Sequence, residues 1–147
     1  MTVITLLTDF GRGSPAAGVL SGVIWSIAPK ARVVELTHQV PRGDLLAAMV
    51  ALDNAAPYFP DGTVHLALAG NLAAAGVPLV ARLGSQFFVG PDNGLVTPLL
   101  EQAEAGRLPV ELYRANSPSF WLTGPREISR ARDVYAPVAA HLAAGVP

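Results

Sequence analysis

The stretch VITLLTDFG, residues 3–11, begins as an unbroken apolar and β-branched run and ends in an aspartate, a phenylalanine and a glycine. A short continuous run of this kind, Val3 to Leu7, is typical of a strand buried on both faces of a sheet. Open α/β sheets bind ligands beyond the carboxyl ends of their strands. The stretch therefore predicts a central parallel strand whose polar end, Thr8-Asp9-Phe10-Gly11, faces a ligand site.

Strand and helix signals alternate along the rest of the chain. Beyond the first run we expect strands over residues 33–36, 63–68, 79–83, 86–89, 110–113 and 119–122. We expect helices from Ser14-Pro15 to Pro29, from an Asp44 cap to Pro57, after the turn Gly90–Gly94, and from Asp133 to Ala144. This alternation gives parallel βαβ units, and Gly84-Ser85 adds a hairpin. The predicted fold is one α/β domain, residues 1–147, of three layers, with a mostly parallel central sheet flanked by helices.

The composition narrows the class of protein. Hydrophobic residues make up 51% of the chain and charged residues 14%, which is too apolar for a disordered chain. This composition predicts apolar surface that is covered by another subunit or by a missing domain. A net charge of −1 with scattered charges argues against a nucleic-acid partner. The chain has no cysteine and therefore no disulfide or thiolate metal site. No apolar run reaches the roughly 18 residues of a membrane span, and the start is a strand rather than a signal peptide, so we expect a cytoplasmic protein.

Asp9 is the strongest candidate functional residue. Its carboxylate follows a strand end beside Gly11, and a group that only accepts hydrogen bonds can receive both hydroxyls of a ribose. It can equally cap the following turn or helix, and position alone does not separate the two roles. We predict that Asp9 and the Gly90–Gly94 turn lie on the same rim of the sheet.

The remaining polar residues give weaker signals. His38 follows the second strand, where a histidine is more often a turn or core residue than a catalyst. His65 lies inside an apolar strand and His141 in an amphipathic helix, so both are interpreted as structural. The histidines lack a metal-ligand spacing, and no metal site is predicted. Asp92-Asn93-Gly94 is first a turn signal, with a binding role second.

Several segments together resemble one family, in order and over essentially the whole chain. They are LLTDFG at residues 6–11, TH at 37–38, PYFP at 57–60, GTVH at 62–65, FVGPDNGL at 88–95 and RDVYAP at 132–137. The chain resembles the S-adenosylmethionine hydroxide adenosyltransferases, which are related to the fluorinating and chlorinating enzymes. The resemblance implies cleavage of adenosylmethionine at C5′ of the ribose by water, and a trimer whose ligand lies between the N-terminal domain of one subunit and the C-terminal β-barrel of its neighbour. These residues represent the N-terminal domain without that barrel.

The resemblance also implies roles for particular residues. It implies that Asp9 binds the ribose hydroxyls, and we expect Phe10, Asp92 and Asn93 to contact the ligand as well. No cofactor is implied, since adenosylmethionine is itself the substrate or ligand. The water-activating Asp, Arg and His of the family are replaced, because Gly70 stands near the Asp position and Arg130 at the His position.

Three functions follow as alternatives. The first is a degenerate family member that binds adenosylmethionine or adenosine through Asp9. The second is an active adenosylmethionine hydrolase in which Asn71, His38 or Arg130, or another chain, replaces the missing groups. The third is a non-catalytic oligomerisation partner of a full-length homologue. The alanine-rich loop Leu72–Ala75 argues against the second, because alanine supplies no acid or base.

Overall fold

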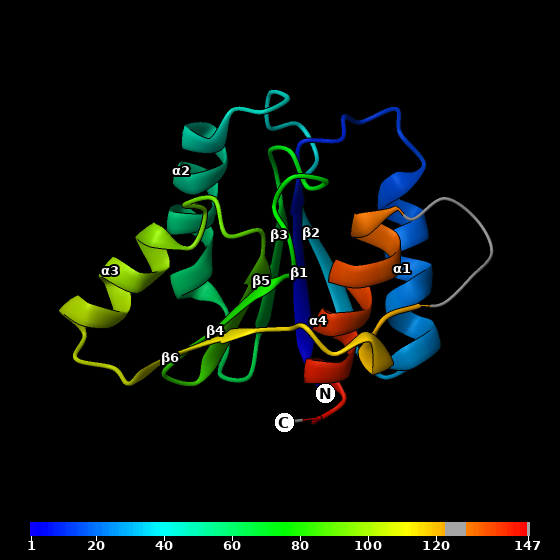
Figure 1. Ribbon diagram of the computed structural model, residues 1–147. Helices are drawn as coiled ribbons and strands as arrows, with labels where there is room; N and C mark the ends of the chain where they lie inside the picture. Colours follow the sequence, from blue (N-terminus) through cyan, green and yellow to red (C-terminus); the bar gives the residue numbers. More distant parts are fainter. Residues whose placement is uncertain (123–128, 147) are drawn as a thin grey trace.

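The computed structural model describes residues 1–122 and 129–146 and contains a six-stranded sheet in the order β2-β1-β3-β5-β4-β6 (Figure 1). The strands are β1 (Val3–Thr8), β2 (Arg32–Thr37), β3 (Val64–Leu68), β4 (Leu79–Leu83), β5 (Gln86–Gly90) and β6 (Val110–Arg114). The α-helices are α1 (Ala16–Ile27), α2 (Leu45–Ala55), α3 (Thr97–Ala105) and α4 (Ala136–Ala143). Strands β2, β1, β3 and β5 pair in parallel, and β4 runs antiparallel to both β5 and β6. The predicted mostly parallel α/β fold is confirmed.

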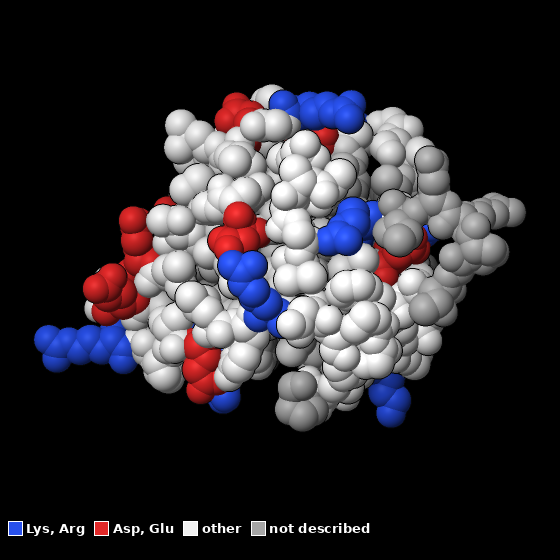
Figure 2. Space-filling view, in the orientation of Figure 1, with Lys and Arg blue, Asp and Glu red and all other residues white. Residues whose placement is uncertain are grey.

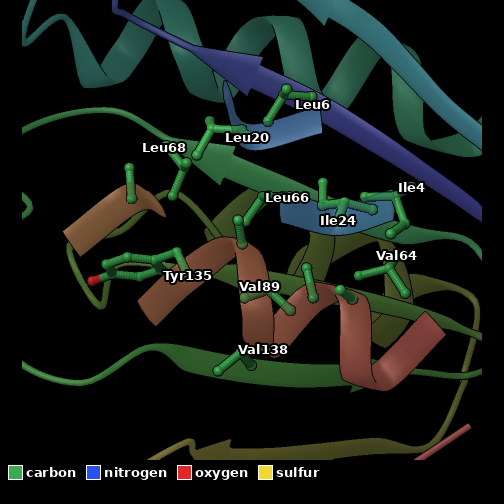
Figure 3. Packing of buried hydrophobic residues seen from close by; sticks show 14 of the residues in the cluster. Ile4, Leu6, Leu20, Ile24, Val64, Leu66, Leu68, Val89, Tyr135 and Val138 are labelled. Carbon is green, nitrogen blue, oxygen red and sulfur yellow. The ribbon is translucent and has the colours of Figure 1, made fainter. Parts of the chain in front are cut away.

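Helices cover both faces of the sheet, so the domain has three layers (Figure 1). One apolar cluster joins α1 and α4 to one face of the sheet, with Ile4, Leu66 and Ile24 among its buried members (Figure 3). A second cluster joins α2 and α3 to the other face and includes Leu7 and Phe88. Strand β1 therefore buries side chains on both faces, as its continuous apolar run predicts.

The helix signals are largely confirmed, with small shifts at the ends. The Asp44 side chain caps α2, because it accepts a hydrogen bond from the Ala47 amide at 3.0 Å. Helix α1 begins at Ala16, one residue later than a helix that starts at Pro15, but the Ser14 hydroxyl still accepts the Ala16 amide at 3.1 Å. Gly145, at φ +89°, follows the end of α4.

Two predictions near the end of the chain are wrong in detail. Residues 119–122 do not form a strand, since Pro118–Phe120 is a 3₁₀-helix in which the Trp121 amide bonds to the Pro118 carbonyl. Proline's fixed φ favours such a turn, and the residue pattern alone does not reveal it. The helix expected from Asp133 begins instead as a π-helix, Ala131–Tyr135, and continues as α4.

The interior of the sheet contains a chain of polar side chains that bond to one another. The buried His65 on β3 lies 2.8 Å from the Thr5 hydroxyl through Nδ1 and 3.2 Å from the Gln86 Oε1 through Nε2. The Gln86 amide nitrogen donates to the carbonyls of Phe59 and Ala56. This orientation of Gln86 makes His65 Nε2 the donor and Nδ1 the acceptor from Thr5. Burial lowers the pKa of His65 below 6.5, so the interpretation of His65 as a structural residue agrees with its contacts.

Candidate functional site

A cleft of about 1260 Å³ lies beyond the carboxyl ends of the parallel strands. The loops after β1, β2, β3 and β5 line it, together with the first residues of α1 and the start of the π-helix. Its lining residues are Asp9, Phe10, Ser14, Pro15, Ala16, Val19, Leu20, Arg42, Gly43, Leu45, Gly70, Asn71, Leu72, Ala73, Ala74, Ala75, Asp92, Asn93, Ser129, Arg130, Ala131 and Arg132. The cleft is in the place where parallel α/β sheets bind ligands.

Asp9 lies at the floor of this cleft, 8% exposed. Its Oδ2 accepts hydrogen bonds from the Gly43 amide at 2.9 Å and from the Gly70 amide at 3.0 Å. Its own amide donates to the Leu68 carbonyl. The carboxylate thus ties the loops after β2 and β3 to the end of β1. Within the described residues, Oδ1 has no protein partner, so it is the oxygen that remains to accept from a ligand.

Asp92 and Asn93 lie in the turn after β5, on the same cleft as Asp9, and the prediction of a shared rim is confirmed. Asn93 joins this turn to the end of β3, because its amide nitrogen donates to the Ala69 carbonyl at 3.0 Å. Asp92 is exposed and forms an ion pair with Arg114 of β6 at 3.5 Å. Of the two, Asp92 has the side chain that a ligand can reach more easily.

Phe10 and the loop after β3 supply the apolar part of the cleft. Phe10 is partly buried and packs against the cluster beneath α1 and α4, with Leu72 of the facing loop packed on the same cluster. The loop begins at Gly70, which has φ +89° and donates its amide to Asp9. A Cβ at Gly70 would lie 2.9 Å from the Asn93 Nδ2 and 3.2 Å from the Leu45 side chain. Glycine at this position is therefore required by the backbone as well as by space.

Two arginines border the cleft at the start of the π-helix. Arg132 forms a paired contact with Asp133, at 2.6 Å to Oδ1 and 2.9 Å to Oδ2. The hydrogen bond from Arg132 lowers the pKa of the Asp133 carboxyl, and the Ser129 amide also donates to it. Arg130 donates through one Nη to the Gly76 carbonyl of the loop after β3. π-Helices are frequent beside functional sites, and this one places Arg130 at the cleft.

His38 stands apart from the cleft lining. Its Nδ1 lies 2.7 Å from the Thr8 hydroxyl, and its carbonyl accepts from the Gly11 amide. Through these two contacts His38 holds the loop after β1 in place. No group of three or more histidine, cysteine or acidic side chains gathers as a metal site within residues 1–122 and 129–146.

The SAM hydroxide adenosyltransferase N-terminal domain family matches residues 4–147. This chain belongs to that family. It is 40% identical to a (R)-S-adenosyl-L-methionine hydrolase of Thermus thermophilus, over 100% of this chain and 59% of that protein. It is 34% identical to a protein of the same name from Salinispora tropica, over 98% of this chain and 54% of that protein. An uncharacterized conserved protein from Thermotoga maritima has the same fold, with TM-score 0.88 and 32% identity over 98% of this chain and 55% of that chain.

This family member spans about half the length of the curated relatives it matches.

The cleft also includes residues that the sequence analysis did not single out, chiefly Arg42 and Ser129. Arg42 follows β2 at its carboxyl end, and the topological rule that pointed to Asp9 also applies to it. Ser129 carried no local signal, because only the return of the chain to the sheet brings it to the cleft. No helix among the described residues is long and apolar enough to cross a bilayer.

Proposed function

We propose that this domain binds adenosylmethionine or adenosine in the cleft through Asp9 and turns adenosylmethionine over at no more than a small fraction of a hydrolase's rate. The observation that carries the proposal is the geometry of Asp9. Two backbone amides fix its Oδ2, so Oδ1 is held in place at the cleft floor to accept the hydroxyls of a ribose. Phe10, Asp92 and Asn93 are proposed to complete the ligand contacts, because they border the same cleft.

The chemistry of the cleft lining supports loss of activity. Attack of water on a ribose carbon needs a base or a polarising charge beside the water. The loop after β3 offers only Gly70, Asn71 and aliphatic side chains among the residues that line the cleft. An amide side chain cannot act as a base, and an arginine such as Arg130 does not accept a proton at neutral pH. Loss of one positioned acid or base typically costs roughly 10²–10⁴-fold in rate.

The second candidate is an active adenosylmethionine hydrolase. It is favoured by 40% identity to a relative with that name over the whole of this chain. His38 is the candidate substitute base within the chain, but its side chain bonds to the Thr8 hydroxyl and does not border the cleft. The missing groups would then have to come from another chain.

Calorimetry with adenosylmethionine and with adenosine, combined with a product assay, tests both candidates. We expect binding of both ligands without robust release of adenosine. Asp9→Asn keeps the acceptor for the two loop amides but removes the charge, and it should weaken binding by roughly tenfold to a hundredfold. Glu104→Gln, on the exposed side of α3, should leave binding unchanged. Rapid adenosine release that His38→Ala abolishes would instead establish the hydrolase.

We also propose that the protein assembles as a homotrimer. Large apolar side chains are exposed on helices and on the edge strand, among them Trp25 on α1 (49%), Leu46 on α2 (69%) and Leu112 on β6 (54%). Uncharged residues cover most of the face shown in Figure 2, which suits burial against other subunits. Sedimentation at micromolar concentration should give a mass about three times that of the chain. A stable monomer would contradict the proposal and would also remove the option of a site completed by a neighbouring subunit.

A further inference from the structure

Strand β1 contains two buried threonines, and the hydroxyl of each contacts a histidine. Thr5 Oγ1 lies 2.8 Å from His65 Nδ1 in the interior of the sheet. Thr8 Oγ1 lies 2.7 Å from His38 Nδ1 at the end of the strand. Both threonines are fully buried, so each hydroxyl needs a hydrogen-bond partner within the protein. The two pairs differ in their position, because the Thr8 pair is directly followed by Asp9 and the Thr5 pair is not.

The Thr8 hydroxyl also fixes the turn that carries the proposed ligand contacts. Its oxygen accepts the Phe10 amide at 3.3 Å, which closes a side-chain turn across Asp9. The carbonyl of His38 accepts the Gly11 amide at 2.9 Å and so holds the other end of the same loop. Two backbone amides hold Asp9 Oδ2, but the direction of Oδ1 depends on this turn as well, because the side chain starts from it. His38 therefore acts on the loop on both sides of Asp9.

The hydrogen-bond inventory determines which atom of the Thr8–His38 pair is the donor. Among the described residues, His38 Nδ1 is the acceptor for the Thr8 hydroxyl hydrogen, since the other contact of that hydroxyl, the Phe10 amide, is itself a donor. It follows that the ring proton of His38 is on Nε2. Glu35 Oε1 lies 3.7 Å from Nε2, and its negative charge favours a proton there. This arrangement leaves the lone pairs of the Thr8 oxygen free for the Phe10 amide.

We propose that His38 is a positioning residue for ligand binding, because by accepting the Thr8 hydroxyl it aligns Asp9 and Phe10 at the cleft. The inference rests on the proposed function, in which Asp9 and Phe10 contact adenosylmethionine or adenosine. His38 does not line the cleft, so it acts through Thr8 and touches no ligand itself. Without this acceptor the Thr8 hydroxyl is a buried donor with no partner, which favours a different conformation of the turn across Asp9.

Calorimetry with adenosine tests the inference. His38→Ala should weaken adenosine binding by roughly tenfold, a factor typical of one lost hydrogen bond. His38→Asn should keep most of the affinity, because its amide oxygen supplies an acceptor in place of Nδ1. Thr8→Val should weaken binding by a similar factor to His38→Ala. Combined with His38→Ala it should cause little further loss, since the two side chains act through one contact.

Thr5→Val is the matched control. It removes the hydroxyl that bonds to His65, which is equally buried in β1 but lies in the interior of the sheet. We expect urea denaturation to show similar losses of stability for Thr5→Val and Thr8→Val, while only Thr8→Val weakens adenosine binding. A purely structural role for His38 predicts instead that affinity follows stability in both variants. The two threonine variants carry the test alone if His38→Ala does not fold.

The outcomes separate this inference from the proposed function. If the wild type binds neither adenosine nor adenosylmethionine, both are wrong. If it binds adenosine, but Thr8→Val binds equally well or Thr5→Val loses as much affinity as Thr8→Val, the positioning role is wrong and the proposed function stands. Robust adenosine release that His38→Asn abolishes as fully as His38→Ala would make His38 a base, since an amide accepts no proton, and would overturn both. Affinity that is retained in His38→Asn and lost in Thr8→Val but not in Thr5→Val supports the inference.

Discussion

His65 and Arg130 both carry buried polar atoms, but their hydrogen bonding differs. Each ring nitrogen of His65 has a partner, and the chain of bonds ends on the carbonyls of Phe59 and Ala56. Arg130 has one carbonyl partner and a buried Nε with none in the described structure. A buried polar group that is fully bonded stabilises the fold, whereas a buried donor without a partner weakens it.

The same difference separates the two sides of the cleft. On one side, Asp9 joins the ends of three strands through the Gly43 and Gly70 amides, and that part of the rim is complete without a ligand. On the other side, Arg130 has a buried Nε without a partner in the described part of the chain. The hydrogen bonding of the rim is therefore complete around Asp9 Oδ2 and incomplete at Arg130 within the described residues.

The largest effect on stability is expected from His65→Ala. The change leaves the Thr5 hydroxyl and the Gln86 carbonyl oxygen without partners and opens a cavity, since His65 is fully buried. We expect a loss of about 3 kcal/mol in the free energy of unfolding, measured by urea denaturation. His141→Ala is the control, because His141 is half-buried and makes an edge-on contact with Phe120 at 5.2 Å. Equal losses in the two variants would contradict the distinction drawn for His65.

Gly70→Ala should cost about 2 kcal/mol and tests how rigid the Asp9 side of the rim is. The substitution places a side chain at φ +89°, close to Asn93 Nδ2 and Leu45. Gly76→Ala is the matched control, with φ +71° and no atom within 4 Å of the point that a Cβ would occupy. It carries the backbone strain alone and should cost about 1 kcal/mol. Chemical denaturation measures the free energy of unfolding of both variants. If the two losses are equal, Asn93 and Leu45 move aside for the added methyl group, and the rim is less rigid than its hydrogen bonds suggest.

Much of this fold was predictable because its strands are buried. Val3–Leu7 is a continuous run of apolar and β-branched residues, and Val64–Leu68 is apolar except for His65. Such runs between helix signals suit strands that are covered on both faces. Residues 119–122 are the exception: four residues are too few to distinguish a strand from a turn, and Pro118 began a 3₁₀-helix there. The π-helix at Ala131–Tyr135 depends on the Ala136 amide bonding to the Ala131 carbonyl, which no local residue pattern specifies.

The candidate site was predictable only in part. The position of Asp9 at a strand end placed it on the rim, but its partners Gly43 and Gly70 are 34 and 61 residues away in sequence. The sequence left open whether Asp9 binds a ligand or caps a turn, and the structure shows that one oxygen is engaged with the loops. The unused donor of Arg130 was not predictable, since it depends on how the chain returns from β6 to α4.

Stability should fall on mild acidification because of His65. Burial lowers the pKa of its imidazole in the folded state below the 6.5 of an exposed histidine, so the unfolded chain binds the proton more readily. The free energy of unfolding therefore decreases as the pH falls from about 6.5 toward the folded-state pKa. Asp133 does not contribute in this window, because the hydrogen bond from Arg132 keeps its pKa below 3.8. Thermal unfolding between about pH 7 and pH 5 should show a steeper decline for the wild type than for His65→Gln; parallel profiles would contradict the assignment.

The smallest effect on stability is expected from Arg130→Gln, and it tests the other half of the comparison with His65. The side chain makes one bond, to a carbonyl of the exposed Gly76 that water can replace, and its buried Nε gains nothing from the protein. The free energy of unfolding should therefore change by no more than about 0.5 kcal/mol. A loss of about 2 kcal/mol without ligand would show that Arg130 supports the fold as His65 does. Arg130 would then stabilise the fold despite its unpartnered Nε, and the contrast with His65 would not hold.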